Sequence, residues 1–241
     1  MKTVIIDTVD SLFPQCMAYV CKKKGFEHPS DETHGKGWSF LRSEWEGKIH
    51  KILLQGEAVV FVAHSIEREK KKKHQKIDVT QPDLSKTGID ILYERCDIIL
   101  YLGYDENDNR KLFGMPREDL VIGARGGIVI DGVEPSFNSI NKAIKKATGK
   151  DFLEIKPTIL LYGPPKIGKS TLAASFPNPC VIDMENGYKF LDVKEKHLCT
   201  DWSDFLNVCA TIFGKPEVAA ETTVEPAIIE TENNEPKQGE L

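Results

Sequence analysis

Apolar runs alternate with amphipathic segments along most of this chain. Continuous apolar runs of strand length occur at residues 3–7, 58–63, 96–102, 158–161 and 180–183. Between these runs, apolar residues recur at the three- and four-residue spacing of helices, at residues 10–24, 38–52, 136–148 and 201–213. Fully apolar strands that alternate with helices are typical of a parallel sheet covered on both faces. The pattern predicts an α/β fold with a mostly parallel sheet flanked by helices.

Three other regions carry weaker patterns. We interpret residues 89–104 as a strand region with its core at 96–102, followed by a turn and by return strands at 110–114 and 120–122. Residues 67–88 show no sustained apolar period, and we expect a long loop there. Long loops inside compact domains are usually functional or mobile.

The last 26 residues differ sharply in composition from the rest. Residues 216–241 hold seven Glu and one Lys, a net charge of −6 in a chain of −5, which leaves +1 for residues 1–215. So polar a segment cannot bury enough apolar surface to offset the entropy of ordering. We therefore expect one domain at 1–215 and a disordered acidic tail at 216–241. The tail solubilises the chain, mimics DNA at a basic loop, or recruits a replication or recombination partner.

Composition also narrows the cellular setting. Of the 241 residues 40% are hydrophobic, which is enough for a core, but no apolar run reaches the length of a membrane span. Asp7 interrupts the apolar start where a signal peptide would continue, so we expect a cytoplasmic protein with no membrane partner. The six cysteines include no Cys-x-x-Cys pair, which favours reduced core thiols over zinc ligands or disulfides.

One motif carries specific chemistry. Residues 163–170 fit the pattern Gly, four residues, Gly-Lys-Ser, which binds phosphate when it follows a strand and opens a helix. In such a loop backbone N–H groups surround the phosphates, Lys169 contacts the β and γ phosphates, and the Ser170 hydroxyl ligates Mg²⁺. The predicted nucleotide-binding residues are Gly163, Pro164, Pro165, Lys166, Ile167, Gly168, Lys169, Ser170 and Thr171.

Polar residues at the ends of three other apolar runs complete this site. Asp7 ends the first run and is placed as the Walker B acid that holds Mg²⁺. His64 ends the second and either senses the γ phosphate or makes only a local hydrogen bond. Glu185 follows the last run and is our candidate for polarising the attacking water, with Asp183 as the less favoured neighbour.

Two cationic features suggest partners. Four consecutive lysines with further cations around them suit a nucleic-acid backbone, although a solvated charged loop is the alternative. The predicted DNA-binding residues are Arg68, Lys70, Lys71, Lys72, Lys73 and Lys76. Arg125, in a glycine-flanked loop, is either a surface arginine or reaches a nucleotide held by a neighbouring subunit, which would make the protein a homo-oligomer.

The assembled motifs resemble the RecA-like ATPases, and more closely the phage nucleotide-binding proteins that act as single-strand annealing proteins or RecA-like core recombinases. The resemblance covers nearly everything except the tail, and its motifs are residues 4–10, 35–38, 62–65, 163–170 and 181–187. It implies a RecA-like P-loop NTPase in which Glu185 is catalytic, Asp7 is the Walker B acid and His64 takes the sensor position that is Gln in RecA. It also implies that residues 68–86 bind single-stranded DNA.

The order of the motifs departs from that family. Family members run phosphate loop, glutamate, Walker B, sensor and DNA loop, whereas this chain starts at Walker B. We interpret the domain as circularly permuted, with a Walker B, sensor and DNA-loop half at 1–150 joined to a Walker A half at 151–215. An assembly artefact, or a truncated copy joined to the start of a second one, are the other origins; no internal duplication is visible in the sequence.

Together these features predict a Mg²⁺-dependent ATPase that acts in phage recombination or annealing, in the cytoplasm of a bacterial host. ATP turnover at Lys169 and Glu185 would be coupled through His64 to a basic loop that holds single-stranded DNA, with Arg125 acting between subunits. A nucleotide-switched binding module in phage assembly, without DNA contact, is one alternative. A helicase or packaging motor is another.

Overall fold

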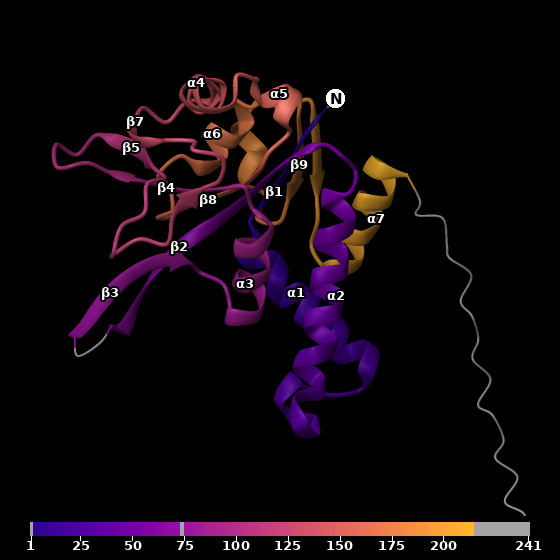
Figure 1. Ribbon diagram of the computed structural model, residues 1–241. Coiled ribbons are helices and arrows are strands. Elements are labelled where there is room, and N and C mark those ends of the chain that lie inside the picture. Colours follow the sequence, from indigo (N-terminus) through magenta and orange to yellow (C-terminus); the bar gives the residue numbers. More distant parts are fainter. Residues whose placement is uncertain (1, 73–74, 215–241) are drawn as a thin grey trace, which may run out of the picture.

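Strands from both halves of the chain form one sheet in the computed structural model, which describes residues 2–72 and 75–214 (Figure 1). The sheet runs in the order β10-β9-β1-β2-β8-β4-β5-β7, with β3 attached to β2 and β6 to β4. The strands are β1 (Thr3–Asp7), β2 (Ala58–Lys72), β3 (Gln75–Pro82), β4 (Ile98–Tyr104), β5 (Arg110–Phe113), β6 (Gly123–Ala124), β7 (Asp131–Val133), β8 (Thr158–Gly163), β9 (Pro179–Asp183) and β10 (Glu195–Leu198).

All neighbouring pairs from β10 to β4 are parallel, which confirms the predicted mostly parallel sheet. The strands β3, β5, β6 and β7 pair in the antiparallel sense. The registers align Asp7 with Asp183, and His64 with Gly163. The carboxyl ends of β9, β1 and β8 therefore lie beside residues 62–64 of β2, at one edge of the sheet.

Helices cover both faces of this sheet (Figure 1). They are α1 (Val9–Lys24), α2 (Lys36–Leu53), α3 (Lys86–Arg95), α4 (Phe137–Thr148), α5 (Phe152–Ile155), α6 (Lys169–Ala174) and α7 (Trp202–Phe213), with short 3₁₀ turns η1 (Pro29–Asp31), η2 (Thr33–Gly35) and η3 (Gly187–Phe190). The first core layer packs α1, α2, α3 and α7 on one face, where the rings of Trp45 and Trp202 are 5.8 Å apart. The second packs α4, α5 and α6 on the other face.

The helices at 10–24, 38–52, 136–148 and 201–213 are confirmed within two residues at each end. Their ends follow local chemistry: Gly25 takes the left-handed conformation after α1, and the Asp201 side chain accepts from the Asp204 N–H at the start of α7. All six cysteines are free, and five of them are buried.

The predicted loop at 67–88 is wrong. Strand β2 continues from the sheet core to Lys72, β3 pairs back along it from Gln75 to Pro82, and α3 follows. Polar residues stand on both faces of this hairpin, so it lacks the apolar alternation by which a half-buried strand is recognised. The Ser85 side chain accepts from the Gly88 N–H and starts α3.

Two other assignments need correction. Residues 89–95, predicted as strand, belong to helix α3, because Ile89 and Leu92 face the core at helical spacing. Residues 120–122 contribute one bridge, between Leu120 and Thr80, rather than a strand of the described sheet. The predicted disorder of residues 216–241 lies outside the described residues.

The two ends of the described chain lie close together. Lys2 and Val4 line one cavity with Ile212 and Phe213. This proximity is what the permuted order requires, and the permuted order itself stays a prediction. None of the described helices is both long and apolar enough to cross a membrane.

Candidate active site

The phosphate loop connects β8 to α6 at the carboxyl edge of the sheet. A Cβ on Gly163 would lie 2.3 Å from the Leu102 carbonyl oxygen of the adjacent strand β4, so only glycine allows this close approach. Gly168 has φ of +103°, which other residues rarely adopt. Sheet packing and loop conformation thus each require one glycine of the motif.

Lys169 is buried beneath this loop. Its Nζ donates to the carbonyl oxygens of Gly163, at 3.0 Å, and Pro164, at 2.9 Å. Burial lowers the pKa of Lys169, and the carboxylates of Asp7, Asp10 and Glu185 oppose that shift. A single ammonium therefore holds the loop and faces the acids of three elements.

Asp7 and Ser170, 163 residues apart in the chain, meet at this position. The Ser170 hydroxyl donates to Asp7 Oδ2 at 2.7 Å. Burial raises the pKa of the Asp7 carboxyl, while the Ser170 hydroxyl, Tyr188 and Lys169 act in the opposite direction. Two hard oxygen donors beside a phosphate loop fit Mg²⁺, so the structure brings together the two residues predicted as its ligands.

Glu185 follows β9 and is held by the start of α1. The Thr8 hydroxyl donates to Glu185 Oε1 at 2.8 Å, and the Ser11 hydroxyl donates to the same oxygen. The Glu185 side chain is 38% exposed, so its second oxygen is open to solvent. Glu185 is thus held in place and accessible to solvent, as a general base that polarises a water molecule must be.

Asp183 has a different environment. It is buried, and its carboxylate accepts the backbone N–H groups of Glu185, Gly187 and Tyr188 at 3.1 Å each. These bonds shape the turn that carries Glu185. Asp183 thus holds the backbone of this turn, and the choice of Glu185 over Asp183 as the catalytic acid stays a prediction.

His64 lies at the same edge, on β2. Its Nδ1 is 2.9 Å from Asp10 Oδ2 and 3.9 Å from Glu185 Oε1, and its backbone N–H donates to Asp10 Oδ1 at 2.9 Å. The hydrogen bond to Asp10 raises the pKa of His64, and burial partly opposes it. The sequence analysis did not select Asp10 as a site residue, although its place three residues after Asp7, in the first turn of α1, was a usable signal.

Arg110 was also missed. It opens β5, and its Nη1 donates to the Ile167 carbonyl oxygen of the phosphate loop at 3.3 Å. The same nitrogen lies 2.8 Å from the position of a Cβ on Gly168. No sequence signal indicated Arg110, because it lies in a segment interpreted only as a return strand.

Arg125 is not brought to this site. Its Nη2 donates to the Glu94 carbonyl oxygen at 2.6 Å, and its Nη1 is 3.6 Å from Asp97 Oδ1. Asp97 accepts the backbone N–H of Thr158, the first residue of β8. Arg125 thus lies at the amino edge of the sheet, opposite the phosphate loop, and its action on a neighbouring subunit stays a prediction.

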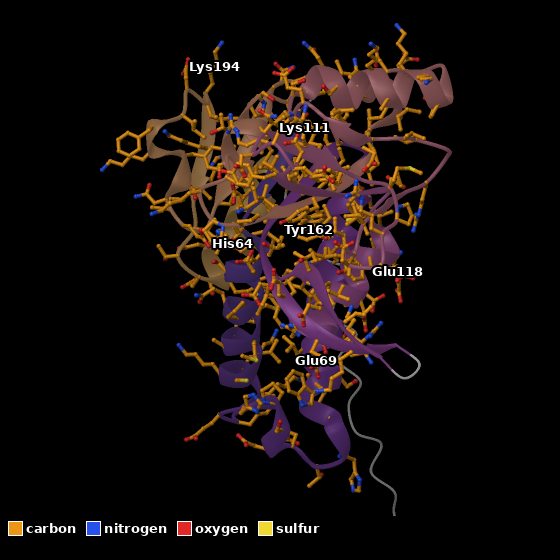
Figure 2. All side chains as sticks on the ribbon, turned by 90° about the vertical axis from the view of Figure 1, so that its left-hand side faces the viewer. His64, Glu69, Lys111, Glu118, Tyr162 and Lys194 are labelled. Carbon is orange, nitrogen blue, oxygen red and sulfur yellow. The ribbon has the colours of Figure 1, made fainter. Side chains whose placement is uncertain are left out.

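The predicted DNA-binding residues lie on the β2–β3 hairpin. In Figure 2, which faces the hairpin, His64 lies near its base and Glu69 farther out. Arg68 Nη2 is 3.7 Å from Asp83 Oδ1 and donates to the Leu84 carbonyl oxygen. Lys76 pairs with Glu69 at 2.9 Å, and Lys70 is exposed. The side chains of Lys71, Lys72 and Lys73 lie outside the part of the chain that the structure describes.

Comparison with known proteins places this geometry in a family. The family model described as "AAA domain" matches residues 1–138 and 155–237, well over half of the chain. The chain belongs to the AAA domain family. As an AAA domain protein with this loop, it is a nucleotide-binding P-loop NTPase.

A curated relative adds a phage context. The AAA domain protein is 33% identical over 111 residues to the SPbeta prophage-derived uncharacterized protein YorG of Bacillus subtilis (strain 168). The aligned part covers 44% of this chain and 32% of the relative, so the match spans about a third of that protein's length. No solved structure matches the chain significantly.

Proposed function

We propose that this AAA domain protein is a Mg²⁺-dependent ATPase of phage recombination or single-strand annealing, with the β2–β3 hairpin as its single-stranded DNA surface. One observation carries the proposal: β2 runs without a break from His64, beside Glu185, into the basic hairpin. The prophage origin of the relative supports the setting, and the RecA-like character is part of the proposal.

ATP turnover would use the residues assembled at the sheet edge. Lys169 would exchange its two carbonyl partners for phosphate oxygens, and Asp7 and Ser170 would hold Mg²⁺. When bound, Mg²⁺ would supply positive charge against the charge that develops on the phosphates. Glu185 accepts the proton of the attacking water through the oxygen that Thr8 and Ser11 leave free.

Coupling to DNA would start at His64. Its ring touches Asp10 on α1 and lies 3.9 Å from Glu185, so a change around the γ phosphate alters the partners of the imidazole. The hairpin begins at the next residue, where Ser65 pairs with Pro82. Nucleotide state and hairpin orientation are therefore linked within a single strand.

The hairpin suits a phosphate backbone. Its ladder runs for eight residue pairs, and it holds Arg68, Lys70 and Lys76 on a ribbon rather than on a loose loop. The ion pairs of Arg68 and Lys76 are solvent-exposed. Such pairs contribute at most about 1 kcal/mol, so a nucleic-acid phosphate can displace the carboxylate partner.

Salt-dependent binding tests this surface directly. Changing Lys70, Lys71, Lys72 and Lys73 to Gln should weaken single-stranded DNA binding and reduce the slope of log K against log salt by up to about 3, since each lost phosphate contact removes roughly 0.7. The matched control changes four exposed lysines of the α4 region, Lys142, Lys145, Lys146 and Lys150. Equal affinity and slope in both variants would reject DNA binding by the hairpin and favour the nucleotide-switched module.

Two further assays address the remaining parts of the proposal. Strand displacement by the ATP-loaded protein would indicate a motor rather than a recombination protein. If Arg125 acts on a neighbouring subunit, mixing the inactive variants Arg125→Ala and Lys169→Ala should restore part of the hydrolysis. No recovery on mixing would reject a role in trans.

A further inference from the structure

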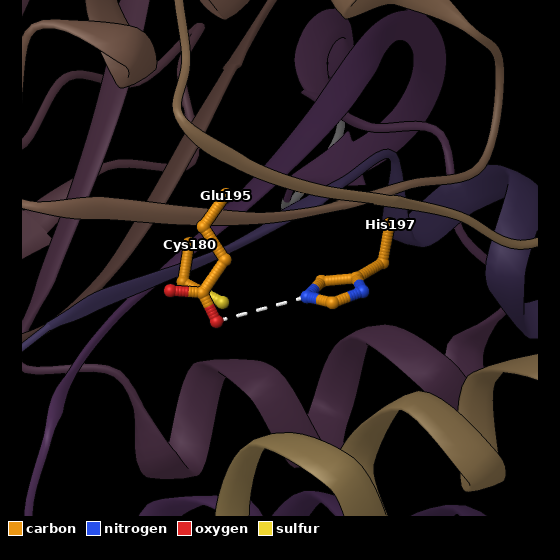
Figure 3. A group of neighbouring side chains, drawn as sticks. All are labelled: Cys180, Glu195 and His197. Carbon is orange, nitrogen blue, oxygen red and sulfur yellow. Dashed lines mark ion pairs between the residues drawn. The ribbon is translucent and has the colours of Figure 1, made fainter.

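A second cluster of chemically reactive side chains lies away from the nucleotide site, on the edge strand β10 and its neighbour β9. Cys180 comes from β9, and Glu195 and His197 come from β10 (Figure 3). The Cys180 Sγ, a Glu195 carboxylate oxygen and a His197 ring nitrogen all lie within 4.8 Å of one another.

Strand pairing creates this arrangement. The parallel register places Glu195 opposite Cys180, and His197 opposite Ile182. Because side chains alternate along a strand, Glu195 and His197 project from the same face of β10. The three donors are thus fixed by a backbone ladder rather than by a loop.

Among the described residues, His197 Nε2 is near a carboxylate but makes no hydrogen bond. This nitrogen is shielded from solvent, and the nearest acid oxygen, Glu195 Oε1, is 3.7 Å away. Cys180 is fully buried beside the same carboxylate. An imidazole nitrogen without a hydrogen bond, a carboxylate and a thiol therefore converge on one point.

We propose that Cys180, Glu195 and His197 form a Zn²⁺ site. A thiolate, an imidazole and a carboxylate are the ligand types that zinc takes in proteins, and three protein ligands leave one tetrahedral position for water. Mg²⁺ prefers an all-oxygen set, which is what Asp7 and Ser170 provide at the nucleotide site. Zn²⁺ would therefore bind between β9 and β10, and Mg²⁺ at the carboxyl edge of the sheet beside the phosphate loop.

Lys2 makes the proposal sharply testable. Its ammonium pairs with Glu195 Oε1 at 2.7 Å, so zinc and Lys2 compete for one carboxylate. Removing the ammonium should strengthen zinc binding by about tenfold, because Glu195 is freed and a nearby positive charge is lost. If the cluster only stabilises the fold through that ion pair, Lys2→Met would leave zinc affinity unchanged.

The experiment uses the full chain, stripped of metal by chelator, and titrates it with Zn²⁺ and with Co²⁺ as a spectroscopic substitute. We expect one tight Zn²⁺ per chain and a thiolate-to-cobalt charge-transfer band. Cys180→Ser should remove the band, and both Cys180→Ser and His197→Gln should weaken zinc by at least about 100-fold, more than loss of an outer-shell partner does.

Two controls separate this cluster from other metal-binding groups. Asp10, His64 and Glu185 also lie within 4.8 Å of one another, so His64→Gln must leave the tight zinc site intact. Cys199→Ser changes another buried thiol and must keep the cobalt band. Loss of tight binding in His64→Gln, or its survival in Cys180→Ser and His197→Gln, would overturn the proposal, and an unchanged zinc affinity in Lys2→Met would do the same.

Discussion

The phosphate loop follows β8 and the hairpin continues the neighbouring strand β2, but the two regions differ in the contacts that hold them. At the loop, buried and half-buried groups from distant parts of the chain bind one another. The Ser170 hydroxyl, for example, donates to Asp7, 163 residues away. Along the hairpin, the side-chain pairs are local and exposed, as Lys76 is with Glu69 seven residues away. The first region is suited to fixing reacting atoms, and the second to adapting to a long, variable polymer.

The largest effect is expected from a substitution in the phosphate loop. Lys169→Ala removes the cation under the loop and should reduce ATP hydrolysis by at least about 100-fold, the order of loss for one transition-state donor. Steady-state phosphate release measures this. Lys150→Ala, an exposed lysine distant from the loop, serves as the control. An unchanged rate in Lys169→Ala would refute the site assignment.

The two acids after β9 offer a matched pair. Glu185→Gln keeps an oxygen for Thr8 and Ser11 but removes the base, so hydrolysis should fall about 100-fold with ATP binding retained. Asp183→Asn instead keeps one acceptor oxygen but turns an NH₂ group toward at least one of the three backbone N–H groups, which should cost about 1–3 kcal/mol of unfolding free energy. Phosphate release and urea unfolding of both variants check this. Reversed phenotypes would mean that the two roles have been exchanged.

Shortening the hairpin tests whether the two regions are separable. Deleting residues 69–78 and joining Arg68 to Val79, which face each other across the ladder, through Asn-Gly gives a tight two-residue turn. We expect loss of single-stranded DNA binding. DNA-independent hydrolysis should stay within about twofold, because the site residues lie outside the deleted segment. A parallel collapse of ATP binding would show that hairpin and site form one unit.

A smaller effect is expected at Arg110. Among the described residues, its guanidinium is bonded to a loop carbonyl alone and can turn to a bound phosphate. Arg110→Ala should therefore lower kcat/KM by about tenfold or more, the worth of a charged hydrogen bond. Arg117 provides the control, because it stacks on Phe113 and pairs with Asp131 instead. Equal kinetics for both variants would exclude Arg110 from the site.

The smallest expected effect is on the pH dependence of stability at His64, where the nucleotide site meets the hairpin. Because Asp10 raises the pKa of His64, the pair stabilises the fold fully below the unfolded value of about 6.5, and this contribution is lost as pH rises through the raised folded pKa. Asp10→Asn should therefore cost more unfolding free energy at about pH 6 than at about pH 9. In a His64→Gln background that pH dependence should vanish; if it persists, another group is responsible.

Sequence alone predicted the parts of the molecule that short motifs encode. The Gly-Lys-Ser motif and the acids and histidine at strand ends were enough to place Asp7, Lys169 and Ser170 together, because parallel strands end at a common edge. The core helices followed from apolar spacing. What failed was the hairpin, whose strands expose charged residues on both faces, and helix α3, whose apolar cluster at 89–92 also fits a strand.

Residues whose roles depend on long-range packing could not be predicted. Arg110 reaches Ile167 across 57 residues, and Cys180 meets Glu195 and His197 only because β10 adds to the edge of the sheet. No local pattern encodes such contacts. Arg125 shows the converse. Its glycine-rich setting suggested contact with a nucleotide of a neighbouring subunit, but within this chain it lies at the edge of the sheet away from the nucleotide site.

The length of β2 has a mechanical consequence. The strand has 15 residues, and the part beyond His64 extends about 25 Å from the sheet at roughly 3.3 Å per residue. In the proposed coupling, it would act as a lever arm that pivots beside the nucleotide site. A tilt of about 5° at that pivot would move the far end by about 2 Å over this length. On the proposed DNA surface, such a displacement would change which phosphates of a bound strand the hairpin contacts.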